Sequence, residues 1–128
     1  MTKLDKILHV EDDPVIQMIT LLCLEKLGGF TVEQACTGKE ALEIAPGFMP
    51  HLLLLDVMMP EMNGPEVLLE VRKLKVTAQT PAIFMTAKAQ DHEVQQLRSL
   101  GALGVIAKPF DPLTLADEIR GLYRKFLN

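Results

Sequence analysis

The sequence predicts an α/β protein in which a parallel β-sheet is wrapped by helices on both faces. Short apolar segments alternate with longer segments whose apolar residues recur at helical spacing, and this alternation is repeated five times along the chain. The segment 52–55 consists of four leucines, which is typical of a strand buried on both faces of a parallel sheet. At 128 residues, the chain has the size of a single domain with its own core.

Five segments are expected to form strands because each is short, apolar and followed by a polar or glycine-containing stretch. These strands are expected over residues 6–10, 30–35, 52–55, 81–85 and 103–107. Five helices should follow them in turn. They are expected over about residues 14–27, 37–46, 65–74, 91–100 and 111–126.

Local signals mark where several of these helices begin. Pro14 and Pro65 suit the first turn of a helix, where the missing N–H costs nothing. Asp13, directly before Pro14, is expected to cap the first helix. Thr37 with Glu40 three residues later is the pattern of a capping box. These signals place the helix starts shortly after the strands end.

The order of the strands follows from the right-handed crossovers of βαβ units. The arrangement expected for five such units is the flavodoxin-like (βα)5 order 2-1-3-4-5, doubly wound and in a single domain. The strand order reverses between strands one and three, and sheets of this kind bind ligands at the carboxyl ends of the strands near that point. The residues that follow the strands are therefore the candidate site residues.

Charged and hydroxyl side chains follow four of the expected strands. Glu11 and Asp12 follow the first, Asp56 the third, Thr86 the fourth and Lys108 the fifth. Like charges about 4 Å apart repel by roughly 4 kcal/mol at an effective dielectric constant of 20, so clustered carboxylates need cations. The lysine supplies one positive charge. The negative charge that is left on the carboxylates predicts a divalent metal, Mg²⁺ rather than Ca²⁺. Such a set can support phosphoryl transfer with an aspartate as nucleophile.

Composition disfavours other classes of protein. The net charge of -4 and the absence of a Lys/Arg cluster argue against a nucleic-acid surface. No segment approaches the roughly 20 apolar residues of a membrane span, and the first apolar run is too short for a signal peptide. We expect a cytoplasmic protein, in which the two cysteines form no disulfide.

Several short motifs occur in a characteristic order. They are the acidic pair 11–12, the block DVMMPEMNG at 56–64, Thr86-Ala87, the glycine element 101–104 and KPF at 108–110. Each motif is weak alone, but together they span most of the chain. The sequence thereby resembles the response-regulator receiver domain of two-component and phosphorelay signalling, of the CheY-like superfamily.

The resemblance implies a role for each matching residue at the phosphoryl group. Asp56 would accept the phosphoryl group, and Lys108 would pair with Asp56 beforehand and then contact the phosphoryl group. Thr86 would act as the switch hydroxyl, while the amide of Ala87 would also reach the phosphoryl group. The resemblance further implies a cis bond between Lys108 and Pro109.

The same resemblance implies the ligands of the Mg²⁺ ion. Asp12 would bind it directly, Glu11 through water, and Asp56 and the backbone carbonyl of Met58 would complete the protein ligands. Met58 and Lys88 also occupy the two positions that flank the attacking water in this family, and we expect these bulky side chains to lengthen the life of the phosphoryl form.

The function expected for residues 1–128 is that of a receiver domain, not an enzyme acting on an external substrate. The domain would be a stand-alone regulator or the receiver of a longer protein, and we favour the former. Its donor would be a sensor histidine kinase or a histidine phosphotransfer protein, and its fourth helix, fifth strand and fifth helix would bind an effector that the sequence does not name. Val105 replaces the aromatic residue common at that face. Thr114 and Glu118 replace an acid and an arginine used by dimeric members, so we expect a monomer or weak dimer.

Other functions fit the sequence less well. A hydrolase with a nucleophilic aspartate needs a second acid two residues later, where this chain has Met58. A flavin or nucleotide site needs a glycine- or hydroxyl-rich first loop, whereas this loop is Glu-Asp-Asp-Pro. The alternative that stays open is a receiver-like interaction module that does not take phosphate.

Overall fold

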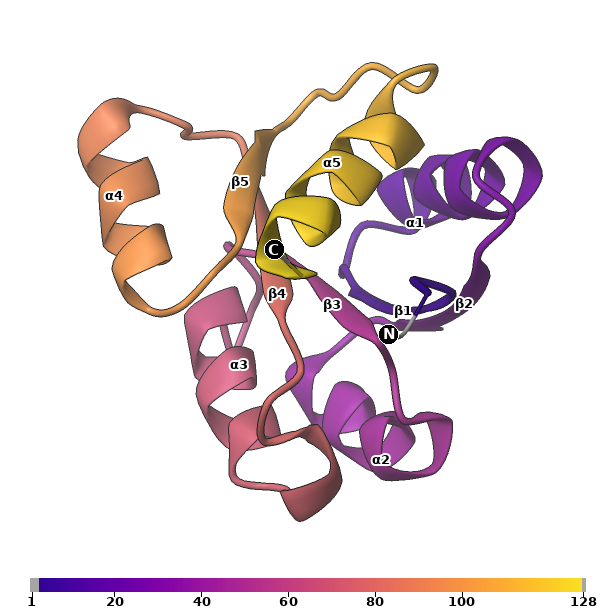
Figure 1. The fold of residues 1–128 in the computed structure, drawn as a ribbon. Helices are drawn as coiled ribbons and strands as arrows, with labels where there is room; N and C mark the ends of the chain where they lie inside the picture. The colour runs from indigo at the N-terminus through magenta and orange to yellow at the C-terminus, as the bar shows by residue number, and fades with distance from the viewer. Residues whose placement is uncertain (1–2, 128) are drawn as a thin grey trace.

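The computed structural model describes residues 3–127 and contains one five-stranded parallel sheet (Figure 1). The order of its strands is β2-β1-β3-β4-β5, which confirms the order predicted from the sequence. The strands are β1 (Lys6–Val10), β2 (Thr31–Ala35), β3 (Leu52–Asp56), β4 (Ala82–Thr86) and β5 (Gly104–Ala107). Each lies within one residue of its predicted bounds at either end.

Within residues 3–127, five α-helices surround the sheet, as the alternating pattern predicts. They are α1 (Pro14–Leu22), α2 (Gly38–Phe48), α3 (Gly64–Arg72), α4 (Asp91–Ser99) and α5 (Leu115–Leu127). A π-helical turn, Cys23–Leu27, prolongs α1, and a short 3₁₀ turn, Lys75–Thr77, precedes β4. Side chains of the π-helical turn after α1 and of α5 belong to the core on one face of the sheet, and side chains of α2, α3 and α4 to the core on the other.

The four leucines of β3 explain why this strand lies at the centre of the fold. Leu52 and Leu54 belong to the core on the α1–α5 face, while Leu53 and Leu55 belong to the core on the opposite face. All four are 0% exposed. Alternate side chains of a strand point to opposite faces, so an unbroken apolar run serves both cores at once.

The caps predicted for α1 and α2 occur, but the predicted capping box does not. Asp13 caps α1 as expected, because its Oδ1 accepts the N–H of Val15 at 2.8 Å. Thr37 caps α2, but Glu40 does not complete the expected capping box and instead accepts the N–H of Cys36. The reciprocal box occurs at α3, where Asn63 and Glu66 satisfy each other's backbone N–H groups. That box was not predicted.

The start of α5 was predicted wrongly, and the end of α2 was placed slightly early. Residues 112–114 form a turn, and α5 begins only at Leu115. Asp111 caps this turn by accepting the N–H of Leu113 at 2.9 Å, so the Asp-Pro signal serves the turn. Helix α2 continues to Phe48 with Pro46 inside it. Among the described residues, no helix has the length and apolar character needed to cross a membrane.

Candidate functional site

Three carboxylates gather at the carboxyl ends of β1 and β3. Glu11, Asp12 and Asp56 each offer an oxygen, and these three oxygens all lie within 4.8 Å of one another. The sheet causes this meeting, because β1 pairs with β3 in a register that places Val10 opposite Leu55. Glu11 and Asp56 are buried, whereas Asp12 is exposed. The structure thus brings together the acids that the sequence predicts to share a pocket.

Lys108 reaches this cluster from the end of β5. Its Nζ donates to Asp56 Oδ1 at 2.8 Å and to Glu11 Oε1 at 3.2 Å. The bond between Lys108 and Pro109 is cis, as the resemblance implied. The contact with Asp56 was expected, but the contact with Glu11 was not, because a sequence does not reveal which of two neighbouring acids a lysine will reach.

Burial and crowding shift the protonation of the cluster. Burial, reinforced by the charge of Asp56, raises the pKa of Glu11 from 4.5 to about 7, although the Asp13 N–H and Lys108 partly oppose the shift. Burial lowers the pKa of Lys108, but the hydrogen bond and charge of Asp56, with those of Glu11, outweigh it and raise that pKa overall. One ammonium therefore does not fully offset the two buried carboxylates.

The remaining predicted site residues are Thr86, Ala87 and Met58, and they differ in burial and in hydrogen bonding. Thr86 ends β4 and is buried, and its Oγ1 accepts the N–H of Lys88 at 3.0 Å. Within residues 3–127, no hydrogen bond joins Thr86 to Asp56. Ala87 is exposed and lines a pocket together with Lys108. Met58, two residues beyond Asp56, has a 69% exposed side chain.

Gly64 has a specific role beside β3, the strand that ends at Asp56. A Cβ at this position would lie 2.5 Å from the carbonyl oxygen of Asp56, closer than real side chains approach backbone atoms. The Gly64 N–H also donates to the carbonyl of Val57 at 3.0 Å. Glycine therefore lets the start of α3 pack directly on the loop that carries Asp56. The sequence pattern includes this glycine without revealing the reason for it.

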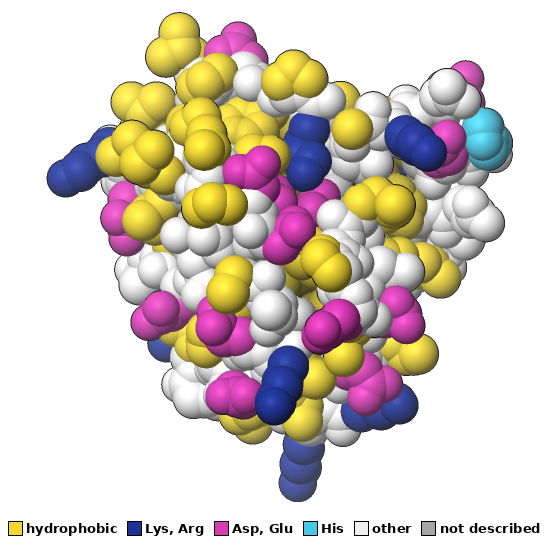
Figure 2. Space-filling model, turned by 180° about the vertical axis from the view of Figure 1, so that it is seen from behind, with side chains coloured by type: hydrophobic (Ala, Val, Ile, Leu, Met, Phe, Trp, Pro, Cys, Tyr) yellow, Lys and Arg dark blue, Asp and Glu magenta, His cyan; other side chains and the backbone are white. Residues whose placement is uncertain are grey.

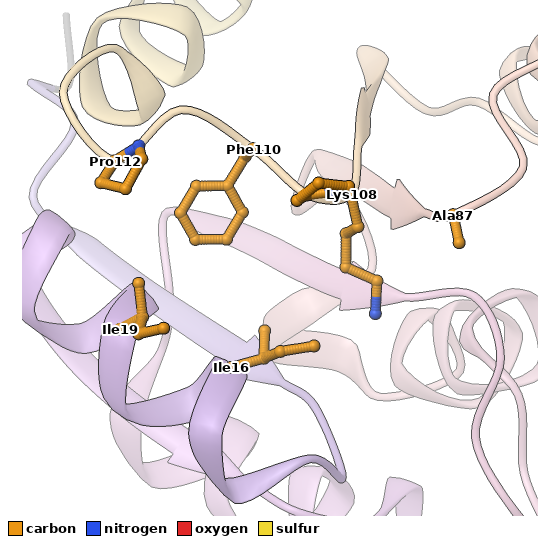
Figure 3. Close-up of a pocket in the computed structure, with 7 residues that line it drawn as sticks. Ile16, Ile19, Ala87, Lys108, Phe110 and Pro112 are labelled. Atoms are coloured by element: carbon orange, nitrogen blue, oxygen red, sulfur yellow. The ribbon is translucent and has the colours of Figure 1, made fainter.

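An apolar pocket of about 430 Å³ adjoins the cluster. Ile16 and Ile19 of α1 form one wall, and Phe110 and Pro112 of the β5–α5 connection face them (Figure 3). Lys108 also lines this pocket. Seen from behind the view of Figure 1, hydrophobic side chains gather in one corner beside acidic and basic groups (Figure 2).

Exposed apolar residues also occur on α1 and in the β5–α5 connection, the two segments that line this pocket, and we call this set the α1 patch. Its members have side chains at least 38% exposed although all are hydrophobic. The α1 patch consists of Val15, Met18, Ile19, Leu22 and Leu113. The helical spacing of α1 was predicted, but a single sequence does not show that part of its apolar surface faces solvent.

His9 is a buried polar residue two positions before the acids. Burial, with a smaller contribution from the charge of Lys108, lowers the pKa of His9 to about 3, so its imidazole is neutral. Its Nδ1 lies 3.0 Å from Gln34 Nε2, the residue paired with it across β1 and β2. His9 is thus a packed, neutral residue that is hydrogen-bonded through Nδ1.

The comparison with protein families decides the identity of the domain. The family described as response regulator receiver domain matches residues 7–120. The chain belongs to the response-regulator receiver domain family. The sequence motifs predicted this family, and the observed strand order agrees with it.

Relatives and solved structures agree with this assignment. The receiver domain is 32% identical over 120 residues to the DNA-binding dual master transcriptional regulator RpaA of Synechocystis, covering 94% of this chain and 49% of that protein. It is 38% identical over 101 residues to the probable transcriptional regulator ycf29 of Porphyra purpurea, covering 78% of this chain and 48% of that protein. The receiver domain thus spans about half the length of these curated relatives.

Among solved structures, the chemotaxis protein CheY4 of Vibrio cholerae superposes with a TM-score of 0.85 at 31% identity. The match covers 94% of this chain and 99% of that one. A putative response regulator of Chloroflexus aurantiacus superposes with a TM-score of 0.83 at 28% identity, covering 95% and 99%. The receiver domain therefore has the CheY-like, flavodoxin-type fold.

Proposed function

We propose that this receiver domain takes a phosphoryl group from a phosphohistidine donor onto Asp56. The observation that carries the proposal is the buried Asp56 carboxylate, which is hydrogen-bonded to Lys108 and lies in a cluster with Glu11 and Asp12. During transfer, negative charge on the phosphoryl oxygens must be stabilised by a positive charge next to the nucleophilic carboxylate. Lys108 can supply this charge because its ammonium is hydrogen-bonded to Asp56.

The proposed step exchanges one bond to phosphorus for another. An oxygen of Asp56 attacks the phosphorus and forms a new O–P bond. The bond between phosphorus and the histidine nitrogen of the donor breaks at the same time, and its electron pair returns to the donor's imidazole. Lys108, which holds Asp56 before the reaction, then donates to a phosphoryl oxygen. We assign the hydroxyl of Thr86 and the amide of Ala87 as further donors to the phosphoryl group.

The acidic cluster suits a magnesium ion. Its donors are carboxylate oxygens, which Mg²⁺ prefers, and among the described residues Lys108 supplies the one ammonium that is hydrogen-bonded to these acids. Asp12, Asp56 and the backbone carbonyl of Met58 would hold the ion, and Glu11 would contribute through water. When bound, Mg²⁺ would offset the charge of the phosphoryl oxygens. The cluster itself needs this cation because Lys108 alone does not balance three carboxylates.

The α1 patch provides a docking surface for the donor. A protein that places a phosphohistidine over Asp56 must cover the atoms around it, and Lys108 lines both the site and the apolar pocket. We infer that a sensor histidine kinase or histidine phosphotransfer protein buries the α1 patch during transfer. Apolar surface removed from water contributes roughly 25 cal/mol per Å², so exposed residues such as Met18 and Leu22 would contribute to affinity.

The output is proposed to lie on α4, β5 and α5. A phosphoryl group adds about -1.5 to -2 charges beside Thr86 and biases a conformational equilibrium of the chain that follows β4. A groove of about 280 Å³ runs between α4 and α5, with Val105 in it where many members carry an aromatic residue. We propose that an effector protein binds this groove and that no aromatic switch is needed for the readout.

We propose that residues 1–128 act as one cytoplasmic receiver domain that catalyses only its own phosphorylation and dephosphorylation. RpaA is described as DNA-binding, and this is a property of that longer protein. The net charge of -4 gives this domain no electrostatic attraction to nucleic acid. We propose a monomer or weak dimer.

Intact mass spectrometry after incubation with acetyl phosphate tests this function. The wild type should gain the mass of one phosphoryl group in the presence of Mg²⁺ and not after Mg²⁺ is removed by a chelator. Asp56→Asn should gain none under either condition. No gain by a folded wild type would contradict the proposal and favour the alternative, an interaction module that does not take phosphate.

A further inference from the structure

A network of side-chain amides surrounds the end of β1. The amide of Gln17, on α1, donates to the carbonyl of Glu11 at 2.7 Å and lies 3.4 Å from the carbonyl of Ala35. The backbone carbonyl of Gln17 in turn accepts from Gln34 Nε2 at 2.8 Å, and the same nitrogen lies 3.0 Å from His9 Nδ1. These side chains join α1, β1 and β2 directly behind the acidic loop.

The contact made by Gln17 falls on the peptide that precedes Asp12. The Glu11 carbonyl belongs to the Glu11–Asp12 peptide plane, and the direction of the Asp12 side chain depends on how that plane is turned. In residues 3–127, the Asp12 carboxylate has no hydrogen bond or ion pair of its own. Its place within 4.8 Å of Glu11 and Asp56 therefore depends on the backbone.

We infer that Gln17 is a positioning residue for the metal site, because its amide fixes the peptide plane from which Asp12 projects. The inference rests on the proposed function, which assigns Asp12 to the metal. Gln34 supports Gln17 from the edge strand, and His9 holds Gln34 in turn. Residues that orient metal ligands without touching the metal usually change its affinity about 10- to 100-fold when replaced.

The network is placed to serve the site more than the general stability of the fold. Glu11 already has a backbone hydrogen bond, from its N–H to the carbonyl of Ala35 at 3.0 Å, so the β1–β2 ladder does not need the glutamine. What Gln17 adds is a second restraint, on the carbonyl side of the same residue. Among the described residues, Asp12 is the one acid of the cluster whose carboxylate has no hydrogen bond or ion pair, so loss of that restraint leaves it free to turn.

The experiment measures metal affinity directly, without a phosphoryl donor. Free Mn²⁺, used in place of Mg²⁺, is measured by electron paramagnetic resonance during titration of wild type, Gln17→Met and Gln34→Met. Methionine keeps the length of the side chain and removes the amide. Gln95→Met removes an amide from an exposed helical position, and Val32→Ala weakens packing on the edge strand without touching the network. Urea unfolding gives the stability of every variant.

We expect Gln17→Met to weaken Mn²⁺ binding roughly tenfold and Gln34→Met to weaken it less. Gln95→Met and Val32→Ala should bind as the wild type does. Wild-type affinity in Gln17→Met would overturn the inference while leaving the proposed function in place. An equal loss of affinity in Val32→Ala at equal stability would also overturn it, as a general effect of destabilisation. A wild type that binds no Mn²⁺ would overturn both this inference and the metal assignment.

Discussion

Lys108 Nζ lies 2.8 Å from Asp56 Oδ1, although 52 residues separate the two along the chain. The side chain of Asp56 is 3% exposed and that of Lys108 is 16% exposed, so water screens the pair weakly. The same ammonium lies 3.2 Å from Glu11, which leaves two buried carboxylates to share one cation. This imbalance makes the stability of the receiver domain sensitive to pH and to divalent metal.

Stability should fall as pH rises through the titration of Glu11. The folded chain keeps this proton up to about pH 7, whereas the unfolded chain loses it near 4.5, so the folded state binds more protons in that window. Above pH 7, where Glu11 is ionised in both states, the free energy of unfolding is lower by roughly 3 kcal/mol than below pH 4.5. Glu11→Gln should therefore flatten the pH dependence of unfolding between these values. Urea denaturation of the wild type and of Glu11→Gln across this pH range measures the free energy of unfolding. The same pH dependence in both proteins would contradict the assignment of this titration to Glu11.

Mg²⁺ should stabilise the receiver domain more at pH 8 than at pH 5. At pH 5, Glu11 is protonated in the folded state and the cluster carries less negative charge. A ligand at a hundred times its dissociation constant stabilises by about 2.7 kcal/mol. Thermal unfolding with increasing MgCl₂ at the two pH values checks this. Asp12→Asn is the control, and it should lose most of the response; an undiminished response would place the metal elsewhere.

Gly64→Ala should lower both stability and the rate of phosphorylation. The new Cβ would press on the carbonyl oxygen of Asp56 and force the acceptor loop to move, at a cost of about 1–3 kcal/mol. Gly47→Ala is the matched control because a Cβ there meets nothing within 4 Å inside α2, and alanine favours a helix. Urea unfolding and acetyl phosphate labelling of the two variants give the comparison. Equal behaviour would show that the loop tolerates the methyl group.

Smaller side chains at positions 58 and 88 should shorten the life of the phosphoryl group. Met58 is 69% exposed two residues beyond the acceptor, and the amide of Lys88 is hydrogen-bonded to Thr86. Met58→Ala and Lys88→Ala remove bulk from the expected path of water, so dephosphorylation should become several-fold faster. Decay of the phosphorylated mass after removal of the donor measures this. Wild-type decay complete within seconds would refute the hypothesis that these residues exclude water.

Charge on the α1 patch should block transfer from a protein donor and leave the small-molecule reaction intact. Leu22→Glu places a carboxylate in the exposed apolar surface without touching Asp56 or Lys108. Leu69→Glu makes the same change on α3, where the side chain is 63% exposed, and serves as the control. The rates with acetyl phosphate should be unchanged in both. Transfer from a panel of phosphorylated histidine kinase domains should fall only in Leu22→Glu; an equal fall in both would exclude α1 as the docking helix.

The sequence predicted most of what depends on strand ends. Asp56 and Lys108 each follow a short apolar strand, and the strand order alone brings such residues to one edge of the sheet. The strand order therefore predicts that the acids lie together. The start of α5 was missed because Asp111 followed by proline fits both a helix start and a capped turn, and only the structure distinguishes the two.

The parts that could not be predicted depend on side-chain contacts between distant elements. Nothing in the spacing of Gln17 and Gln34 reveals that one amide reaches the Glu11 carbonyl and the other reaches Gln17. Likewise, the need for glycine at 64 arises from a close approach to the Asp56 backbone and not from an unusual turn. Contacts of this kind depend on how α1 and α3 pack against the sheet.

The most direct test of the central claim is to locate the modified residue. After labelling with acetyl phosphate and Mg²⁺, sodium borohydride reduces an aspartyl phosphate to homoserine, which peptide mass spectrometry can identify. We predict homoserine at position 56, absent without Mg²⁺ and absent in Asp56→Asn. Homoserine at another acid, or none in a protein whose intact mass had increased, would contradict Asp56 as the phosphoryl acceptor.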